Sequence, residues 1–97
     1  MIRSFRDAGT KDIYNCVDSK AARRSCPQKL WKVAHRKLDY LWGAAELRDL
    51  ASPPGNQLEA LKKDRIGQHA IRINDQYRIC FEWTPQGPLN VEIVDYH

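Results

Sequence analysis

The 97-residue sequence has no long apolar run and few cysteines. No stretch approaches the ~20 apolar residues that a membrane-spanning helix needs, and the first residues lack the apolar run of a secretory signal. We therefore expect a cytoplasmic protein that makes no membrane contact. The three cysteines, Cys16, Cys26 and Cys80, follow neither metal-ligand nor C-x-x-C spacing. This pattern predicts reduced thiols that are buried or half-buried.

Most motifs that carry chemistry are absent as well. The sequence has no glycine-rich phosphate loop, no metal-spaced cluster of His or Cys, and no Ser or Cys in a recognisable nucleophile context. Hydride transfer, nucleotide hydrolysis and zinc chemistry therefore lose support, and we expect neither a cofactor nor a metal. A chain of this length buries one core but not two, so we expect a single domain over residues 1–97.

Charge of one sign is missing from two segments. Residues 20–37 contain seven basic residues and no acidic one, whereas residues 79–97 contain three acidic residues and no Lys or Arg. The basic segment is compatible with a contact to a polyanion such as RNA, or with an ordinary solvated helix face. Charge alone leaves both interpretations open.

Apolar spacing predicts two helices in the first half of the chain. Residues 2–5 can form a short opening strand, and Thr10 is expected to cap a brief helix that ends before a polar linker at residues 18–20. Ser25-Cys26-Pro27-Gln28 has the spacing of a capping box for a second helix, which should run to about Trp42. The predicted solvated face of this helix carries Lys29, Lys32, Arg36 and Lys37.

The second half changes to a period of two, which is typical of strands. A helical piece over residues 44–50 and a proline-containing loop over residues 52–56 come first. Alternating apolar residues then predict three strands, at residues 69–73, 77–83 and 89–96, joined by two turns. The sequence therefore predicts an α+β fold in which two N-terminal helices pack on a small antiparallel sheet.

Two arginines flank the first predicted hairpin turn. Arg72 and Arg78 lie on the side of their strands opposite the aliphatic residues, where two neighbouring guanidinium groups could bind a phosphate. The alternative is a structural ion pair between one of these arginines and Glu82 or Glu92. On spacing alone the ion pair is slightly favoured.

Several ordered motifs together resemble the HigB branch of the RelE-like toxins. The similarity extends over essentially the whole chain and is strongest from Glu46 to His97. The segments that carry it are Glu46-Leu47-Arg48-Asp49-Leu50, Pro53-Pro54-Gly55-Asn56, Asp64-Arg65-Ile66-Gly67, Ile71-Arg72-Ile73-Asn74-Asp75-Gln76-Tyr77-Arg78-Ile79-Cys80-Phe81 and Val91-Glu92-Ile93-Val94-Asp95-Tyr96-His97.

The resemblance implies a toxin that enters the ribosomal decoding site and cleaves messenger RNA there. It also implies a helix-turn-helix antitoxin of the HigA type, held with the toxin in a hetero-tetramer built on an antitoxin dimer. By motif position, the family's active-site residues correspond here to Lys62, Arg78, Asp95, Tyr96 and His97. Some members carry a histidine three residues before the lysine, where this chain has Glu59.

RNA supplies its own nucleophile, the 2′-hydroxyl, so the chemistry needs only strand positioning, two proton transfers and charge neutralisation. Arg78 and Lys62 suit the charge role, and Tyr96, His97 or Glu59 the proton transfers. A cationic neighbour favours the ionised form of a tyrosine, so we expect Lys62 or Arg78 beside Tyr96. Further RNA contacts are expected from Arg36, Lys37, Lys63, Arg65 and Arg72.

Two other functions fit the same sequence. A ParE-like toxin of this fold would inhibit gyrase instead of cutting RNA, because a fold does not determine a function. A non-catalytic module would bind RNA or protein through its basic helix and leave the terminal Asp-Tyr-His inert.

Overall fold

The structure, a computed structural model, describes residues 1–96; the predicted site residue His97 lies outside the described residues. Four strands form one antiparallel sheet in the order β1-β2-β3-β4. The elements are α1 (Ala8–Tyr14), α2 (Lys20–Ser25), α3 (Trp31–Gly43), β1 (Glu59–Ala60), β2 (Gln68–Arg72), β3 (Tyr77–Thr84) and β4 (Gly87–Asp95), with short 3-10 turns η1 (Gln28–Leu30), η2 (Leu47–Ala51), η3 (Pro54–Asn56) and η4 (Lys63–Arg65).

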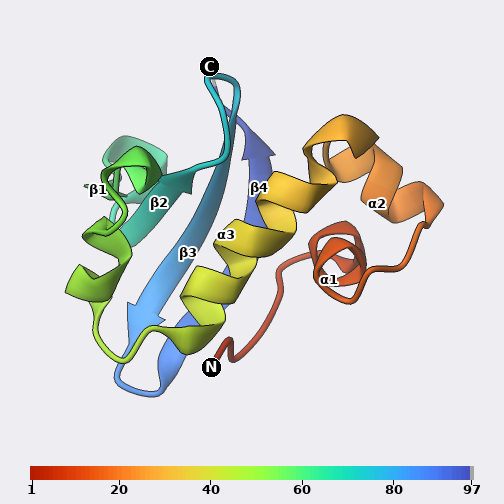
Figure 1. The fold of residues 1–97 in the computed structure, drawn as a ribbon. Coiled ribbons are helices and arrows are strands. Elements are labelled where there is room, and N and C mark those ends of the chain that lie inside the picture. The colour runs from red at the N-terminus through yellow and green to blue at the C-terminus, as the bar shows by residue number, and fades with distance from the viewer. Residues whose placement is uncertain (97) are drawn as a thin grey trace.

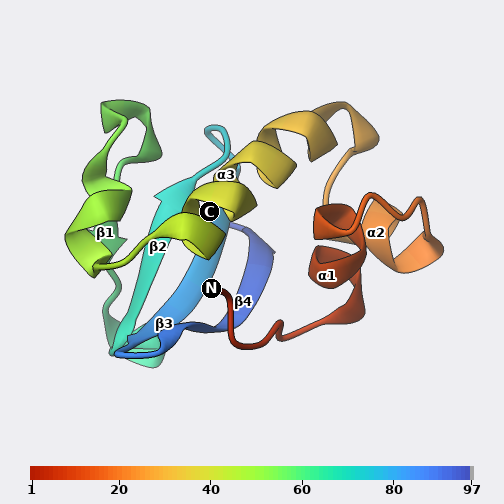
Figure 2. The same ribbon diagram turned by 60° about the horizontal axis from the view of Figure 1, so that its bottom comes forward.

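The helices and the antiparallel sheet confirm the predicted α+β class, and the helices leave one face of the sheet uncovered. In Figures 1 and 2, α3 crosses one face of the sheet, while α1 and α2 lie beside it beyond the β4 edge. None of the helices within residues 1–96 is long and apolar enough to cross a membrane.

The predicted helix starts are wrong, and so is the number of helices. Asp7, not Thr10, caps α1 by accepting the Thr10 backbone N–H at 2.6 Å. Thr10 is fully buried, and its hydroxyl accepts the backbone N–H of Ile93 on β4 at 3.0 Å. The predicted linker instead begins a third helix, α2, which Ser19 caps. Both caps fit the preference of Asp and Ser for this position.

Ser25 ends α2 and does not open the long helix. A proline-led 3-10 turn, η1, takes its place, so that α3 begins only at Trp31. At the N-terminus the predicted opening strand is reduced to one parallel bridge between Phe5 and Val91. The short strand β1, which pairs with β2, was not predicted.

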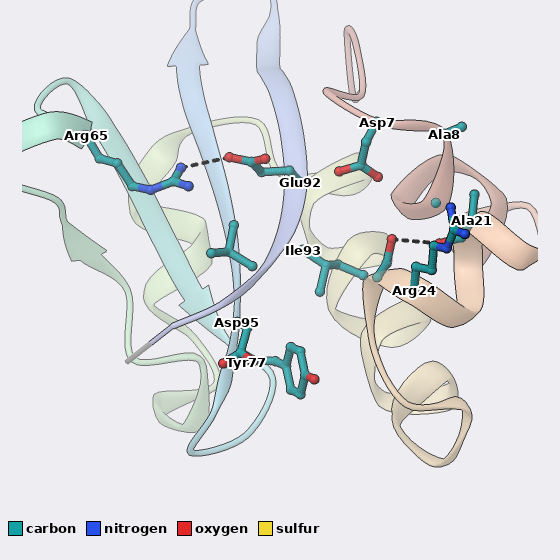
Figure 3. Close-up of a pocket in the computed structure, with 12 residues that line it drawn as sticks. Asp7, Ala8, Ala21, Arg24, Arg65, Tyr77, Glu92, Ile93 and Asp95 are labelled. Carbon is teal, nitrogen blue, oxygen red and sulfur yellow. Dashed lines mark hydrogen bonds and ion pairs between the residues drawn. The ribbon is translucent and has the colours of Figure 1, made fainter.

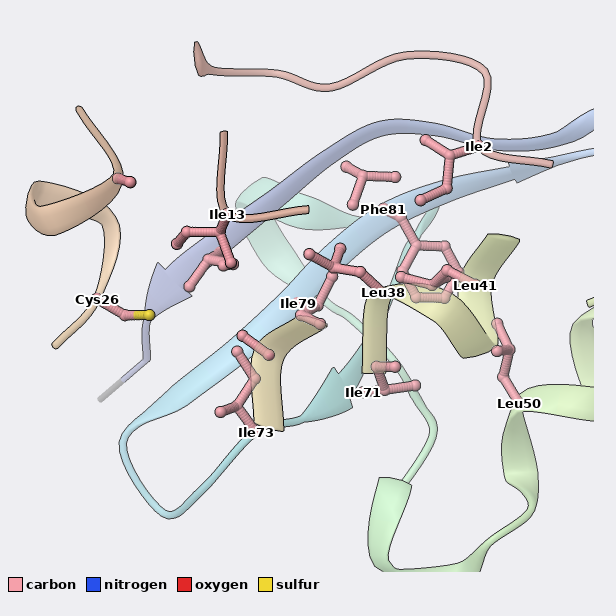
Figure 4. Packing of buried hydrophobic residues seen from close by; sticks show 14 residues of the cluster. Ile2, Ile13, Cys26, Leu38, Leu41, Leu50, Ile71, Ile73, Ile79 and Phe81 are labelled. Carbon is pink, nitrogen blue, oxygen red and sulfur yellow. The ribbon is translucent and has the colours of Figure 1, made fainter. Parts of the chain in front are cut away.

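As expected from the period of two, alternate residues of the strands face the helix side of the sheet. Ile71, Ile79 and Phe81 are fully buried against Leu38 and Leu41 of α3 (Figure 4). Burying side chains of this size contributes about 1.5–3 kcal/mol each, so this core fixes α3 across the sheet.

The residues in between point to the opposite face of the sheet. Leu61, Ala70 and Cys80 form a second, smaller buried cluster there, with Val94 and Tyr96 packed against it. We call this side, which the three α-helices leave uncovered, the open face.

Candidate active site on the open face

The open face brings Arg78 and Tyr96 together, as the sequence predicted. Arg78 pairs with Val94 across the β3–β4 ladder, and the backbone N–H of Tyr96 donates to the Gln76 carbonyl at 2.7 Å. This bond carries the pairing one residue past β4. The guanidinium carbon of Arg78 then lies 5.7 Å from the centroid of the Tyr96 ring, within the range of a cation–π contact.

Arg72 and Arg78 are direct partners across the β2–β3 hairpin. The hairpin itself satisfies both guanidinium groups: Arg72 pairs with Asp75, and Arg78 donates to the backbone carbonyls of Asn74 and Tyr77. Because neither arginine uses Glu82 or Glu92, the ion-pair alternative is wrong. A carbonyl partner leaves the positive charge of Arg78 unneutralised.

Glu92 belongs to a different arginine. Its carboxylate accepts from Arg65 at 2.8 Å and lies 3.8 Å from Arg6. The hydrogen bond to Glu92 raises the pKa of Arg65 above its usual value. Arg65 also donates to Gln68 at 3.1 Å. The alternation of β4 indicated that Glu92 shares a face with Val94, but the sequence did not show that Arg65 would reach it.

Glu59 and Lys62 lie at the border of this face. The register pairs Glu59 with Ala70, which places Glu59 over the open face, and Lys62 follows directly after the buried Leu61. Both side chains are exposed, and within residues 1–96 neither forms a hydrogen bond or an ion pair. A carboxylate and an ammonium group are therefore available to a ligand at this border.

Asp95 is placed away from Arg78. It pairs with Tyr77 in the ladder, on the other face of the sheet, and accepts from Gln76 at 3.0 Å. Burial, and then the Asp95 charge, raise the pKa of Tyr77. Figure 3 shows Asp95 and Tyr77 along a groove of about 550 Å³ between β4 and α2, with Arg24 on the opposite side.

Lys37 is not on a solvated helix face. Its side chain is buried, and its ammonium donates to the amide oxygen of Asn56 at 2.6 Å. Burial lowers the pKa of Lys37, and the charges of Arg36 and Arg72 lower it further. Asn56 in turn donates to the carbonyls of Leu50 and Ser52. Sequence reasoning missed Asn56, which holds the loop that leads into β1, although the loop itself was predicted.

The cysteines are free. Cys26 and Cys80 are buried, as predicted, but Cys16 is exposed. Within residues 1–96 no group of three or more His, Cys, Asp or Glu side chains is placed to hold a metal ion.

Comparison with known proteins gives the family. The sequence profile described as "RelE-like toxin of type II toxin-antitoxin system HigB" matches residues 3–97. The chain belongs to the HigB-like toxins. It is similar to Toxin HigB-1 of Vibrio cholerae serotype O1, with 36% identity over 93% of this chain and 92% of that protein. It is also 35% identical to an uncharacterized protein of Haemophilus influenzae, over 96% of this chain and 88% of that one.

Membership of a HigB-like, type II toxin-antitoxin family implies an antitoxin partner. The match also spans the open face together with the helices on the other side of the sheet. Both surfaces therefore belong to the HigB-like unit.

Proposed function

We propose that this HigB-like toxin is a ribosome-dependent endoribonuclease. It cleaves messenger RNA in the decoding site by metal-independent attack of the RNA 2′-hydroxyl on the neighbouring phosphate. The attack forms a 2′,3′-cyclic phosphate and breaks the P–O5′ bond, and the 5′ oxygen leaves as a hydroxyl after it gains a proton. The observation that carries the proposal is the Arg78 guanidinium over the Tyr96 ring on the open face, bordered by the exposed Lys62 and Glu59.

The roles follow from the chemistry of each group. Arg78 and Lys62 neutralise the charge that develops on the phosphate oxygens, since fixed cations stabilise a transition state more than a ground state. Tyr96 and Glu59 are the groups proposed to move protons to and from the reacting oxygens. Asp95, which faces Tyr77, fixes the end of β4 in this scheme, and His97 completes the terminal motif.

We also propose where the toxin acts, which residues contact RNA and which partner restrains it. The toxin acts in the cytoplasm as a single domain, residues 1–97, and contacts RNA through exposed or half-exposed cations. A HigA-type helix-turn-helix antitoxin restrains it in a hetero-tetramer built on an antitoxin dimer. The RNA-contacting cations are Arg36, Lys63, Arg65 and Arg72; Lys37 is left out because it is buried.

The test maps cleavage of messenger RNA on translating ribosomes for Arg78→Ala and Tyr96→Phe. We expect each change to lower the cleavage rate by about 10²-fold or more, as is usual when a charge-stabilising or proton-transferring group is lost. Growth arrest should be relieved in parallel.

Matched controls are Arg48→Ala and Tyr40→Phe. Arg48 is exposed and, within residues 1–96, its side chain bonds to Glu46 alone, and Tyr40 packs against the core on the helix side of the sheet. Both controls should cleave at the wild-type rate. Full activity of Arg78→Ala and Tyr96→Phe would refute the site. Poisoning of purified gyrase with messenger RNA left intact would point instead to a ParE-like inhibitor.

A further inference from the structure

Three aromatic rings form a stacked row where α1 meets the outer side of α3. Tyr14 lies between His35 and Trp42, with ring centroids 5.2 Å and 5.7 Å away and interplanar angles of 22° and 23°. The Tyr14 hydroxyl donates to Asp39 at 2.8 Å, and His35 lies 3.5 Å from the same carboxylate. His35, Asp39 and Trp42 share one side of α3 because residues four and then three positions apart face the same way.

A groove continues this row toward the start of α3. It has a volume of about 420 Å³, and Ile13 and Trp31 form apolar walls. Val17, which follows the groove residue Cys16, is 45% exposed, and Trp42 at the other end of the row is 42% exposed. These are two of the four large, clearly exposed apolar side chains among residues 1–96. An apolar surface of this kind marks a site of association.

Cations flank the same surface. Lys32 lines the groove, and Lys29 is exposed nearby on η1. Within the described part of the chain neither lysine forms an ion pair or a side-chain hydrogen bond. Charge complementarity therefore favours a partner that presents acidic side chains beside apolar ones.

Basic and aromatic residues together also occur in RNA-binding surfaces, but the row of rings favours a protein here. Both faces of the Tyr14 ring are covered by His35 and Trp42, so the ring cannot stack on a base.

We infer that this surface, formed by Tyr14, Val17, Trp31, His35 and Trp42, is where the antitoxin docks, through an acidic amphipathic segment. We call it the antitoxin face. The inference rests on the toxin role in the proposed function but not on the cleavage chemistry. Since α3 lies between this surface and the sheet (Figure 2), the antitoxin face and the open face are on opposite sides of α3 and the sheet.

The experiment measures the Kd between the purified toxin, refolded after separation from its antitoxin, and the cognate HigA-type antitoxin. Val17→Asp and Lys32→Glu each place a negative charge on the antitoxin face. We expect each to weaken binding about tenfold or more, which is typical when a central interface residue is changed. The controls make the same changes near the open face: Ile66→Asp, at an 80% exposed residue, and Lys63→Glu. Both controls should keep the wild-type Kd.

Two results would overturn the inference. If the control variants lose the antitoxin, or if all four variants keep it, the antitoxin docks elsewhere. If Val17→Asp and Lys32→Glu bind the antitoxin normally but lose ribosomes, the surface serves RNA. Thermal unfolding of each variant checks that it folds. Because Val17→Asp and Lys32→Glu change different residues, one variant still tests the inference if the other fails to fold. Because this assay does not measure cleavage, a failure of the proposed nuclease activity would leave its outcome unaffected.

Discussion

Individual side chains on the open face differ in how firmly the fold holds them. Arg65 is fixed by Glu92 and Gln68, and Arg72 by Asp75. Among residues 1–96, Arg78 contacts backbone carbonyls and the Tyr96 ring but no carboxylate, so its charge is available to a ligand. Arginine suits that role because its planar group can bond a phosphate with two parallel donors.

Glu59 is the residue for which a test is most informative. Its side chain is exposed and unpaired within residues 1–96. If it accepts the proton of the 2′-hydroxyl, Glu59→Gln should lower the maximal cleavage rate about 10²-fold and remove the loss of activity on acidification. The measurement is the pH dependence of cleavage on ribosomes.

Asp64→Asn is the control for this change. Asp64 is also exposed, and its side chain makes no hydrogen bond or ion pair within the described residues. The Asp64→Asn substitution should leave the pH dependence of cleavage unchanged. A wild-type profile for Glu59→Gln would assign the proton transfers to Tyr96 or His97.

Among the helices, α1 packs most closely against α2. A Cβ atom on Gly9 would lie 2.0 Å from the Ser25 hydroxyl oxygen and 2.4 Å from the Ala21 carbonyl oxygen. The two helices can approach this closely only because residue 9 has no side chain. Their contact positions Thr10, which binds the β4 backbone at Ile93.

Gly9→Ala should therefore lower the free energy of unfolding by about 1–3 kcal/mol, the usual cost of overpacking. Gly43→Ala is the matched control, since Gly43 also lies in a helix and its Cβ would meet no atom within 4 Å. Alanine should leave stability unchanged or raise it by up to about 1 kcal/mol through helix propensity. Chemical denaturation measures both, and equal stabilities would contradict the close approach.

At the scale of the whole molecule, the stability should depend on pH through buried thiols. Burial raises the pKa of Cys26 and of Cys80 to about 11, from an ordinary value of 9.0. The unfolded chain loses these protons first, so the free energy of unfolding should fall from about pH 9 and level off only past pH 11.

Two other groups act in the same alkaline range. Tyr14, whose pKa burial and Asp39 raise to about 12, adds to the loss above pH 10. Lys37 acts in the opposite direction, since burial lowers its pKa and the folded state loses that proton first. Denaturant unfolding at pH 7.5–10 tests the effect, and the Cys26→Ala, Cys80→Ala double variant should show a flatter dependence. An equally steep decline in that variant would contradict the role of the thiols.

The two proposed functions, RNA cleavage and antitoxin binding, lie on different surfaces of the molecule. The open face carries Arg78 and Tyr96, while the antitoxin face lies beyond α3 on the other side of the sheet. The sheet is one layer, so each strand contributes alternate residues to the two sides.

That alternation is what the sequence by itself determined. A period of two identifies a strand and assigns its residues to two faces, so the apolar core under α3 was predictable. For Tyr96 the sequence offered two cationic neighbours, Lys62 and Arg78, and the structure shows Arg78 at its ring. The terminal motif and its neighbours likewise indicated the family without any structure. Local patterns suffice for these features because they depend on residues close together in the chain.

Tertiary structure alone decided which partner each charged group finds. Buried Lys37 donates a hydrogen bond to Asn56, 19 residues further on, and Glu92 accepts one from Arg65, 27 residues before it. The starts of the helices also depended on distant contacts, since Thr10 binds Ile93 and leaves the capping position to Asp7. A hydrogen bond between distant segments depends on how the elements pack, and no local spacing encodes that packing.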